Sequence, residues 1–149
     1  MRIETILCPV DLSPKSKLAV KAALRLAKLD GAKVLILNIQ EDFLSKKDMV
    51  MLRVSEKLFA EKQKQVAIDA QEKIQKLIKS AGGAGDTEIE ILLRQGKPYA
   101  EIVETASKFD ADLIVMATDG RSGIVENVAG SNAERVLHAA KCSVLAVRE

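Results

Sequence analysis

Short apolar runs alternate with longer amphipathic stretches along the whole chain. The amphipathic stretches carry apolar residues at helical spacing, and the apolar runs are rich in Ile, Val and Leu. The runs have the length of strands and occupy residues 3–8, 34–39, 87–94, 113–116 and 143–147. Helices are expected from 13–30, from about 48 to 80, from 98 onward and from 131 to 140. Strands that alternate with helices predict a parallel sheet covered on both faces.

Local signals refine these elements. Ser13 and Pro14 suit the cap and first position of the first helix, and Asp30-Gly31 suits its end. The 48–80 stretch is regular only in its second half, where residues 66, 70, 74, 77 and 78 share a face, so its first half is expected to pack separately or to move. The 87–94 run alternates Ile with Glu, which predicts a strand at the edge of the sheet.

The stretch from Leu113 to Leu137 holds the candidate chemistry. An apolar strand leads into a glycine-bearing polar loop and then into a helix that begins at Gly130-Ser131. The first turn of such a helix presents unpaired N–H groups and suits a phosphate. With a sheet order of 3-2-1-4-5, this loop would lie beside the end of the 3–8 strand, where the strand order reverses and ligands bind.

The composition narrows the function classes. A net charge of +2 and four aromatic residues in 149 offer no field or stacking surface for nucleic acid, and no apolar run suits a membrane. Cys8 and Cys142 form no disulfide framework, so we expect a reduced, cytoplasmic protein.

His138, the only histidine, is too far from Ser131 for a nucleophilic pair, and no zinc spacing is present. G-x-x-x-x-G-K-[ST] and G-x-G-x-x-G are both absent, which disfavours a P-loop NTPase and an NAD-type enzyme. No catalytic cluster is evident, so we do not expect an enzyme.

The loop follows the spacing Ala117-x2-Gly120-x9-Gly130-Ser131, and Pro9-Val10-Asp11-Leu12-Ser13 follows the first strand. With the ending 142–148, these residues resemble the universal stress protein family, whose nucleotide-binding members carry G-x2-G-x9-G-[ST]. The resemblance covers the whole chain, 1–149, as one domain. It implies a flavodoxin-like (Rossmann-like), doubly wound five-stranded parallel sheet of order 3-2-1-4-5. It also implies a stress-response regulatory module that switches rather than catalyses, with at most very slow ATP hydrolysis, often as a homodimer paired through the last strand.

The resemblance also implies a site for an adenine nucleotide, ATP or AMP, with Mg²⁺ or Mn²⁺ beside a triphosphate. The Asp11 carboxylate would contact the adenosine end, and the backbone of Ile39 would lie along the adenine. The backbone at Gly120 and Gly130 would approach the phosphates, and the Ser131 hydroxyl would bond them. The full candidate set is Pro9, Val10, Asp11, Ile39, Met116, Ala117, Gly120, Arg121, Gly130, Ser131 and Asn132.

Several of these residues have alternative interpretations. Ala117 replaces the first motif glycine, and its methyl group would crowd a ligand unless the residue has ordinary strand dihedrals. Ser131 and Glu134 form a capping box, which by itself would explain Ser131. Arg121 is either a solvated loop residue or a phosphate ligand. Asp11 could cap the helix or start a turn, but Ser13 is expected to be the cap, which would leave Asp11 the freer group and favours its functional role. The alternative function is a dimeric protein-interaction module that binds no nucleotide.

Overall fold

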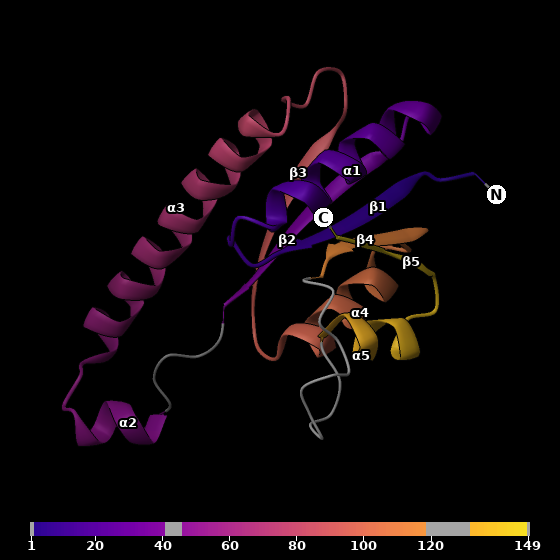
Figure 1. Ribbon diagram of the computed structural model, residues 1–149. Helices are drawn as coiled ribbons and strands as arrows, with labels where there is room; N and C mark the ends of the chain where they lie inside the picture. The colour runs from indigo at the N-terminus through magenta and orange to yellow at the C-terminus, as the bar shows by residue number, and fades with distance from the viewer. Residues whose placement is uncertain (1, 41–45, 119–131, 149) are drawn as a thin grey trace.

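The computed structural model describes residues 2–40, 46–118 and 132–148 (Figure 1). The chain forms β1 (Thr5–Val10), α1 (Ser16–Asp30), β2 (Lys33–Gln40), α2 (Lys46–Met51), α3 (Glu56–Ser80), β3 (Ile89–Gln95), α4 (Pro98–Lys108), β4 (Leu113–Ala117), α5 (Asn132–Ala139) and β5 (Ser143–Val147). All neighbouring strands are parallel, in the order β3-β2-β1-β4-β5. The predicted doubly wound fold, its strand order and the edge position of β3 are therefore confirmed. None of the described helices is long and apolar enough to cross a membrane.

The sheet separates two aliphatic cores. On one face, alternate residues of the central strands pack against α1 and α3, and on the other face the intervening residues pack against α4 and α5. Leu7 and Cys8, for example, are adjacent in β1 and are both fully buried, one in each core. Burial on both faces explains why the central strands read as continuous apolar runs rather than alternating ones.

Strands β1 and β4 separate toward their carboxyl ends. Their pairing is limited to Ile6–Leu113 and Leu7–Ile114, although β1 continues to Val10 and β4 to Ala117. The strand order reverses at this point, because β2 lies on one side of β1 and β4 on the other. The divergence opens the carboxyl edge of the sheet where the fold predicts a ligand.

Helix α1 begins later than the sequence predicts. Its first residue is Ser16, and Lys15 at the cap position makes no side-chain capping bond. Ser13 and Pro14 form a preceding turn in which the amides of Ser16 and Lys17 donate to their carbonyls. The end of the helix is as predicted, since Gly31 adopts a left-handed φ of 69° that favours glycine.

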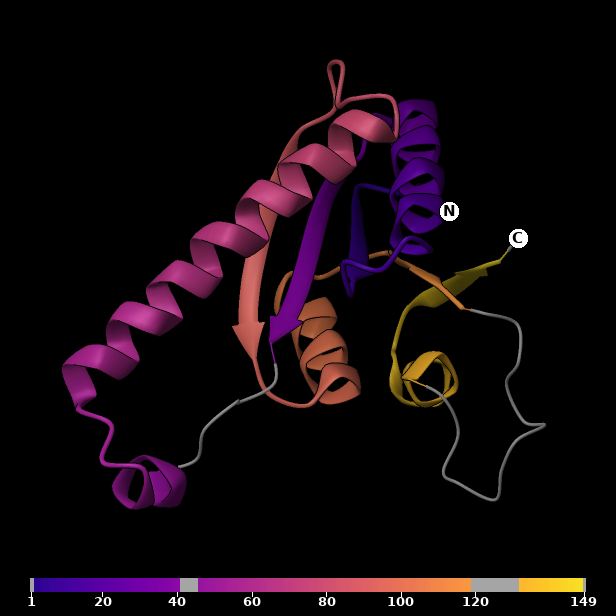
Figure 2. The ribbon, with the colours of Figure 1, turned by 60° about the vertical axis from the view of Figure 1, so that its left-hand side comes forward.

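The 48–80 stretch is two helices rather than one. A break over residues 52–55 includes Arg53 at a φ of 54°, and the Ser55 hydroxyl accepts the Leu58 amide at 3.0 Å to cap α3. Ile74 and Ile78 of α3 are buried in the core against the sheet and Ala70 is also buried, whereas Val66 is 39% exposed. Helix α2 and the first turns of α3 lie away from the sheet in both ribbon views (Figures 1 and 2). The less regular half of the predicted helix is therefore the half that leaves the core.

Candidate functional site

A cavity of about 380 Å³ lies at the carboxyl ends of β1, β2 and β4. This volume is within the range of small-molecule sites, about 300–1,000 Å³. Helices α1, α4 and α5 complete its walls. Its described lining is Pro9, Val10, Asp11, Lys15, Ser16, Leu37, Ile39, Pro98, Ile102, Met116, Ala117, Thr118, Asn132 and Ala133.

Seven of the eleven predicted site residues line this one cavity: Pro9, Val10, Asp11, Ile39, Met116, Ala117 and Asn132. The other four lie outside the described residues: Gly120, Arg121, Gly130 and Ser131. The predicted capping box is therefore not described either, because Ser131 would supply its hydroxyl. Asp11 follows β1, and Asn132 begins α5. The structure therefore brings the end of the first strand and the start of the last helix to the same space.

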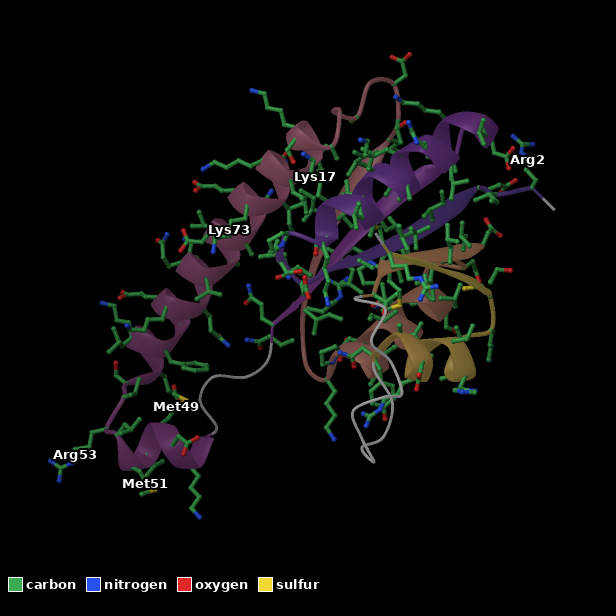
Figure 3. The ribbon with its side chains drawn as sticks, in the orientation of Figure 1. Arg2, Lys17, Met49, Met51, Arg53 and Lys73 are labelled. Atoms are coloured by element: carbon green, nitrogen blue, oxygen red, sulfur yellow. The ribbon has the colours of Figure 1, made fainter. Side chains whose placement is uncertain are left out.

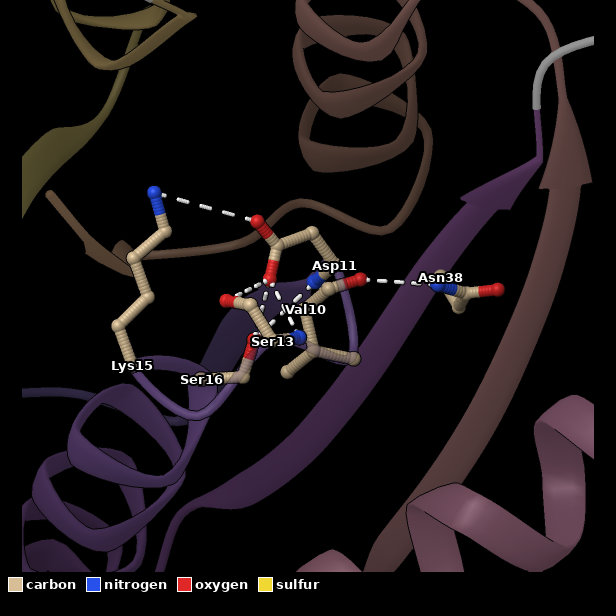
Figure 4. A network of polar contacts seen from close by, with 6 residues as sticks. All are labelled: Val10, Asp11, Ser13, Lys15, Ser16 and Asn38. Carbon is tan, nitrogen blue, oxygen red and sulfur yellow. Dashed lines mark hydrogen bonds and ion pairs between the residues drawn. The ribbon is translucent and has the colours of Figure 1, made fainter.

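Asp11 is the centre of a polar network (Figure 4). Its Oδ1 accepts the Ser13 amide at 2.9 Å, the Ser13 hydroxyl at 2.5 Å and the Ser16 hydroxyl at 2.8 Å. Because the Ser13 amide donates to it, the Asp11 carboxylate closes a turn on the backbone two residues along the chain. The Asp11 amide donates to Ser16 Oγ at 3.1 Å. The inference that a Ser13 cap leaves Asp11 the freer group is wrong: Ser13 is a hydrogen-bond donor to Asp11, because the helix starts three residues later.

The second oxygen of Asp11 faces outward. Lys15 Nζ lies 4.0 Å from Oδ2, and the Asp11 side chain is 59% exposed. Partial burial raises the pKa of the carboxyl, but the Ser13 and Ser16 hydrogen bonds and the Lys15 charge outweigh it and hold the pKa below its ordinary value. The site therefore presents a fixed carboxylate with one oxygen held by the turn and the other available to a ligand donor.

Asn38 joins the ends of two strands behind the cavity. Its Nδ2 donates to the Val10 carbonyl at 3.0 Å, and the side chain is buried (Figure 4). Its Oδ1 is buried and has no hydrogen-bond partner among the described residues. The bond holds β1 to β2 one residue before Asp11, so Asn38 fixes the position of the turn that carries the carboxylate.

Strand β2 extends beyond its β1 partner. The β1–β2 pairing ends at Val10–Asn38, whereas β2 continues to pair with β3 through Gln40. Ile39 is half-buried in the cavity wall, in the part of β2 that has no β1 partner. On the side where β1 would lie, the backbone of this part of β2 borders the cavity. Main-chain groups there suit recognition of a flat polar edge.

Ala117 ends β4 in ordinary strand conformation. Its φ is not in the left-handed region, and its register partner is Val147 of β5. The half-buried residue packs against the core beneath α1 as well as lining the cavity. The backbone at this position therefore does not require glycine, which meets the condition under which the substitution is harmless.

Seven further lining residues were not predicted: Lys15, Ser16, Leu37, Pro98, Ile102, Thr118 and Ala133. Strand alternation gives a signal for Leu37, which shares a sheet face with Ile39. Pro98 begins the helix after β3, so its place at the carboxyl edge follows from topology. The sequence holds no local signal for Ser16, because its role depends on where α1 begins.

The cysteines do not belong to this cavity. Complete burial in β1 raises the pKa of Cys8 to about 12, and Cys142 is half-buried before β5. Across residues 2–40, 46–118 and 132–148, no three His, Cys, Asp or Glu side chains gather in a way that could hold a metal ion.

Comparison with known proteins agrees with the fold and with the family resemblance. The model of the universal stress protein family matches residues 2–148. A universal stress protein of Methanocaldococcus jannaschii is 35% identical over 144 residues, covering 97% of this chain and 81% of that protein. A universal stress protein solved in complex with cAMP superposes with a TM-score of 0.73 at 24% identity, covering 99% of this chain and 98% of the other. One from Archaeoglobus fulgidus in complex with dAMP has a TM-score of 0.55 at 21% identity and covers 98% of each chain. The chain belongs to the universal stress protein family.

Proposed function

We propose that this protein is a regulatory module that binds an adenine nucleotide in the cavity between β1 and β4. The observation that carries the proposal is the convergence of Asp11, Ile39, Met116 and Asn132, from four separate elements, on one cavity at the switch point of the sheet. Two structural neighbours bind cAMP and dAMP, which supports adenine as the base.

The nucleoside would lie between the ends of β1 and β2. The main chain of Ile39 would meet the polar edge of adenine, while the apolar side chains of Leu37, Ile102 and Met116 would cover the ring. Asp11 Oδ2 would accept a hydrogen bond from a ribose hydroxyl, because Oδ1 is already held by three donors.

The phosphates would lie toward the start of α5, whose N-terminus favours anions. The motif residues Gly120, Gly130 and Ser131 would supply this end of the site, with Arg121 as a further candidate and Mg²⁺ or Mn²⁺ beside a triphosphate. Ala117 would contact the same end from β4. ATP and AMP would share the adenosine contacts and would differ only in the number of phosphate groups bound at the start of α5.

The proposed action is binding rather than turnover. The lowered pKa of Asp11 makes it a weak general base, and its hydrogen bonds fix it in the turn rather than aim it at a phosphate. Binding would instead stabilise the folded state, by about 2.7 kcal/mol at a ligand concentration 100 times the Kd.

Isothermal titration with Mg-ATP and with AMP tests the proposal. A matched pair of variants gives it a control, because Ala133 lines the cavity whereas Ala139 is exposed on the same helix. Ala133→Leu should weaken binding at least tenfold by filling the cavity, and Ala139→Leu should leave it unchanged. No heat and no shift in melting at millimolar nucleotide would refute the proposal. Mass spectrometry of nucleotide released from freshly purified protein would identify the natural ligand.

We also propose that β5 pairs with its copy in a second subunit. It is the last strand of the sheet, and Leu145 and Ala146 on it are exposed. An apolar edge strand offers unpaired backbone groups to another strand. This pairing would also serve a protein-interaction module without a nucleotide. A monomer in light scattering at micromolar concentration would contradict it.

A further inference from the structure

A second concave surface lies on the other side of the β1–α1 turn, away from the nucleotide cavity. This groove has a volume of about 470 Å³ between the start of α1 and the last turns of α3. Its described lining is Leu12, Ser13, Pro14, Lys17, Lys73, Lys76, Leu77 and Ser80. The sequence holds no local signal for this combination of residues, because α1 and α3 meet only through the fold.

Three lysines gather on this groove from two helices. Lys17 comes from α1, and Lys73 and Lys76 are three residues apart on one face of α3. Figure 3 shows Lys17 beside α1 and Lys73 on the neighbouring α3. No carboxylate is among the described lining residues, and none of the three lysines is within 4.0 Å of an acidic group in the described part of the chain. Three like charges that line one groove favour binding of an anion that neutralises them.

The other groups on the groove define the ligand. The hydroxyls of Ser13 and Ser80 already donate, to Asp11 Oδ1 and to the Leu77 carbonyl, so the ammonium groups are the available donors. Leu12 and Leu77 are only partly exposed and form an apolar floor. Lysines act as flexible point charges and do not select one planar group. We propose that this groove is a second anion site, for a small ligand that carries two or more phosphate groups.

The two sites share one wall. Asp11, Lys15 and Ser16 face the nucleotide cavity, and Leu12 and Ser13 in the same turn face the groove. Leu12 has a φ of 65°, an uncommon conformation for a branched side chain that must be held by its surroundings. Ser13 donates two hydrogen bonds to Asp11, so a ligand that displaces this turn would change the nucleotide affinity. This coupling, unlike the groove itself, rests on the proposed function, and by linkage it is reciprocal.

The test uses inorganic triphosphate as the probe, followed by the amide signals of the full-length protein in NMR. Triphosphate should shift the amides of Leu12, Lys17 and Leu77, and it should do so with AMP, which carries a single phosphate, present at saturation. Shifts confined to Ile39, Met116 and Asn132 would place the anion in the nucleotide cavity and overturn the proposal. The amides that line the groove and the amides that line the nucleotide cavity are separate signals. A protein that binds no nucleotide would therefore still show whether triphosphate binds in the groove.

Two double variants separate the groove from general attraction to a basic surface. Lys73→Gln with Lys76→Gln should weaken triphosphate binding roughly tenfold, since two exposed charge pairs are lost. Lys57→Gln with Lys64→Gln removes the same charge from exposed positions of the same helix outside the groove, and should leave binding nearly unchanged. Equal losses in both double variants, or no wild-type binding at millimolar triphosphate and low salt, would overturn the proposal.

Discussion

Restoring the motif glycine by Ala117→Gly should cost stability without improving nucleotide binding. Ala117 has ordinary strand dihedrals, so the change relieves no backbone strain and adds chain entropy to the unfolded state, at a cost of about 0.5–1 kcal/mol. Loss of a half-buried methyl group adds roughly 0.4 kcal/mol, half the value for a fully buried CH₂. The free energy of unfolding should therefore fall by about 1–1.5 kcal/mol, which lowers Tm by roughly 2–6 °C in a domain of this size.

The same structure sets the expected change in affinity. The Ala117 methyl packs against the core beneath α1 in addition to bordering the cavity, so its removal opens little space for a phosphate. Affinity for Mg-ATP, measured by titration calorimetry beside a urea unfolding curve, should stay within about threefold of wild type, or ~0.7 kcal/mol. A gain of tenfold or more would refute this reasoning and show that the methyl group blocks the phosphate end.

Three shorter predictions concern the groups around the cavity. Asn38→Asp should destabilise the fold by more than about 3 kcal/mol in urea unfolding, because it buries a carboxylate beside the Val10 carbonyl. Asn38→Leu removes Oδ1 but also leaves the Val10 carbonyl without this donor, so it should cost about 1–3 kcal/mol, and a cost equal to that of Asn38→Asp would contradict this account. Asp11→Asn should be less stable than wild type by about 0.5 kcal/mol at pH 7, a figure discounted for exposure. Because the folded-state pKa of Asp11 is lowered, that difference should shrink in melting curves as the pH falls below about 4, and a gap that persists at pH 2 would refute it. An aromatic disulfide reagent should label Cys142 in the native protein, slowed by the raised pKa of that thiol, and should reach Cys8 only after unfolding.

The strands and their parallel sheet could be predicted because their signals are local and repeated, whereas the strand order was implied only by the family resemblance. Each central strand is buried on both faces and reads as an unbroken apolar run, while β3 at the edge alternates Ile with Glu. Gly31 marks the end of α1 with the left-handed φ that its residue type allows. Signals of this kind act within a few residues and do not depend on what packs against them.

The start of α1 and the break before α3 depended on competition between neighbouring signals. Ser13 is a good cap by residue type, but the Asp11 carboxylate binds its amide and hydroxyl first and closes a turn. Ser55 is also a good cap by residue type, but it stands in a stretch of strong helix formers. In the structure the left-handed φ of Arg53 and the Ser55 cap together mark the break. Both serines have the residue type of a helix cap. Whether each one caps a helix was decided by its contacts in the folded protein.

The position of the candidate site follows from topology more than from the glycine motif. The carboxyl ends of β1 and β4 must separate, because each strand turns toward a helix on a different face of the sheet. Asn38 then holds the end of β1 to β2, and the turn after it places Asp11 on the rim of the opening. These contacts are made by described residues outside 119–131, and in the proposed site they would serve the adenosine end. The motif would instead decide what lies at the phosphate end, which is why replacing its first glycine with Ala117 need not remove adenine binding.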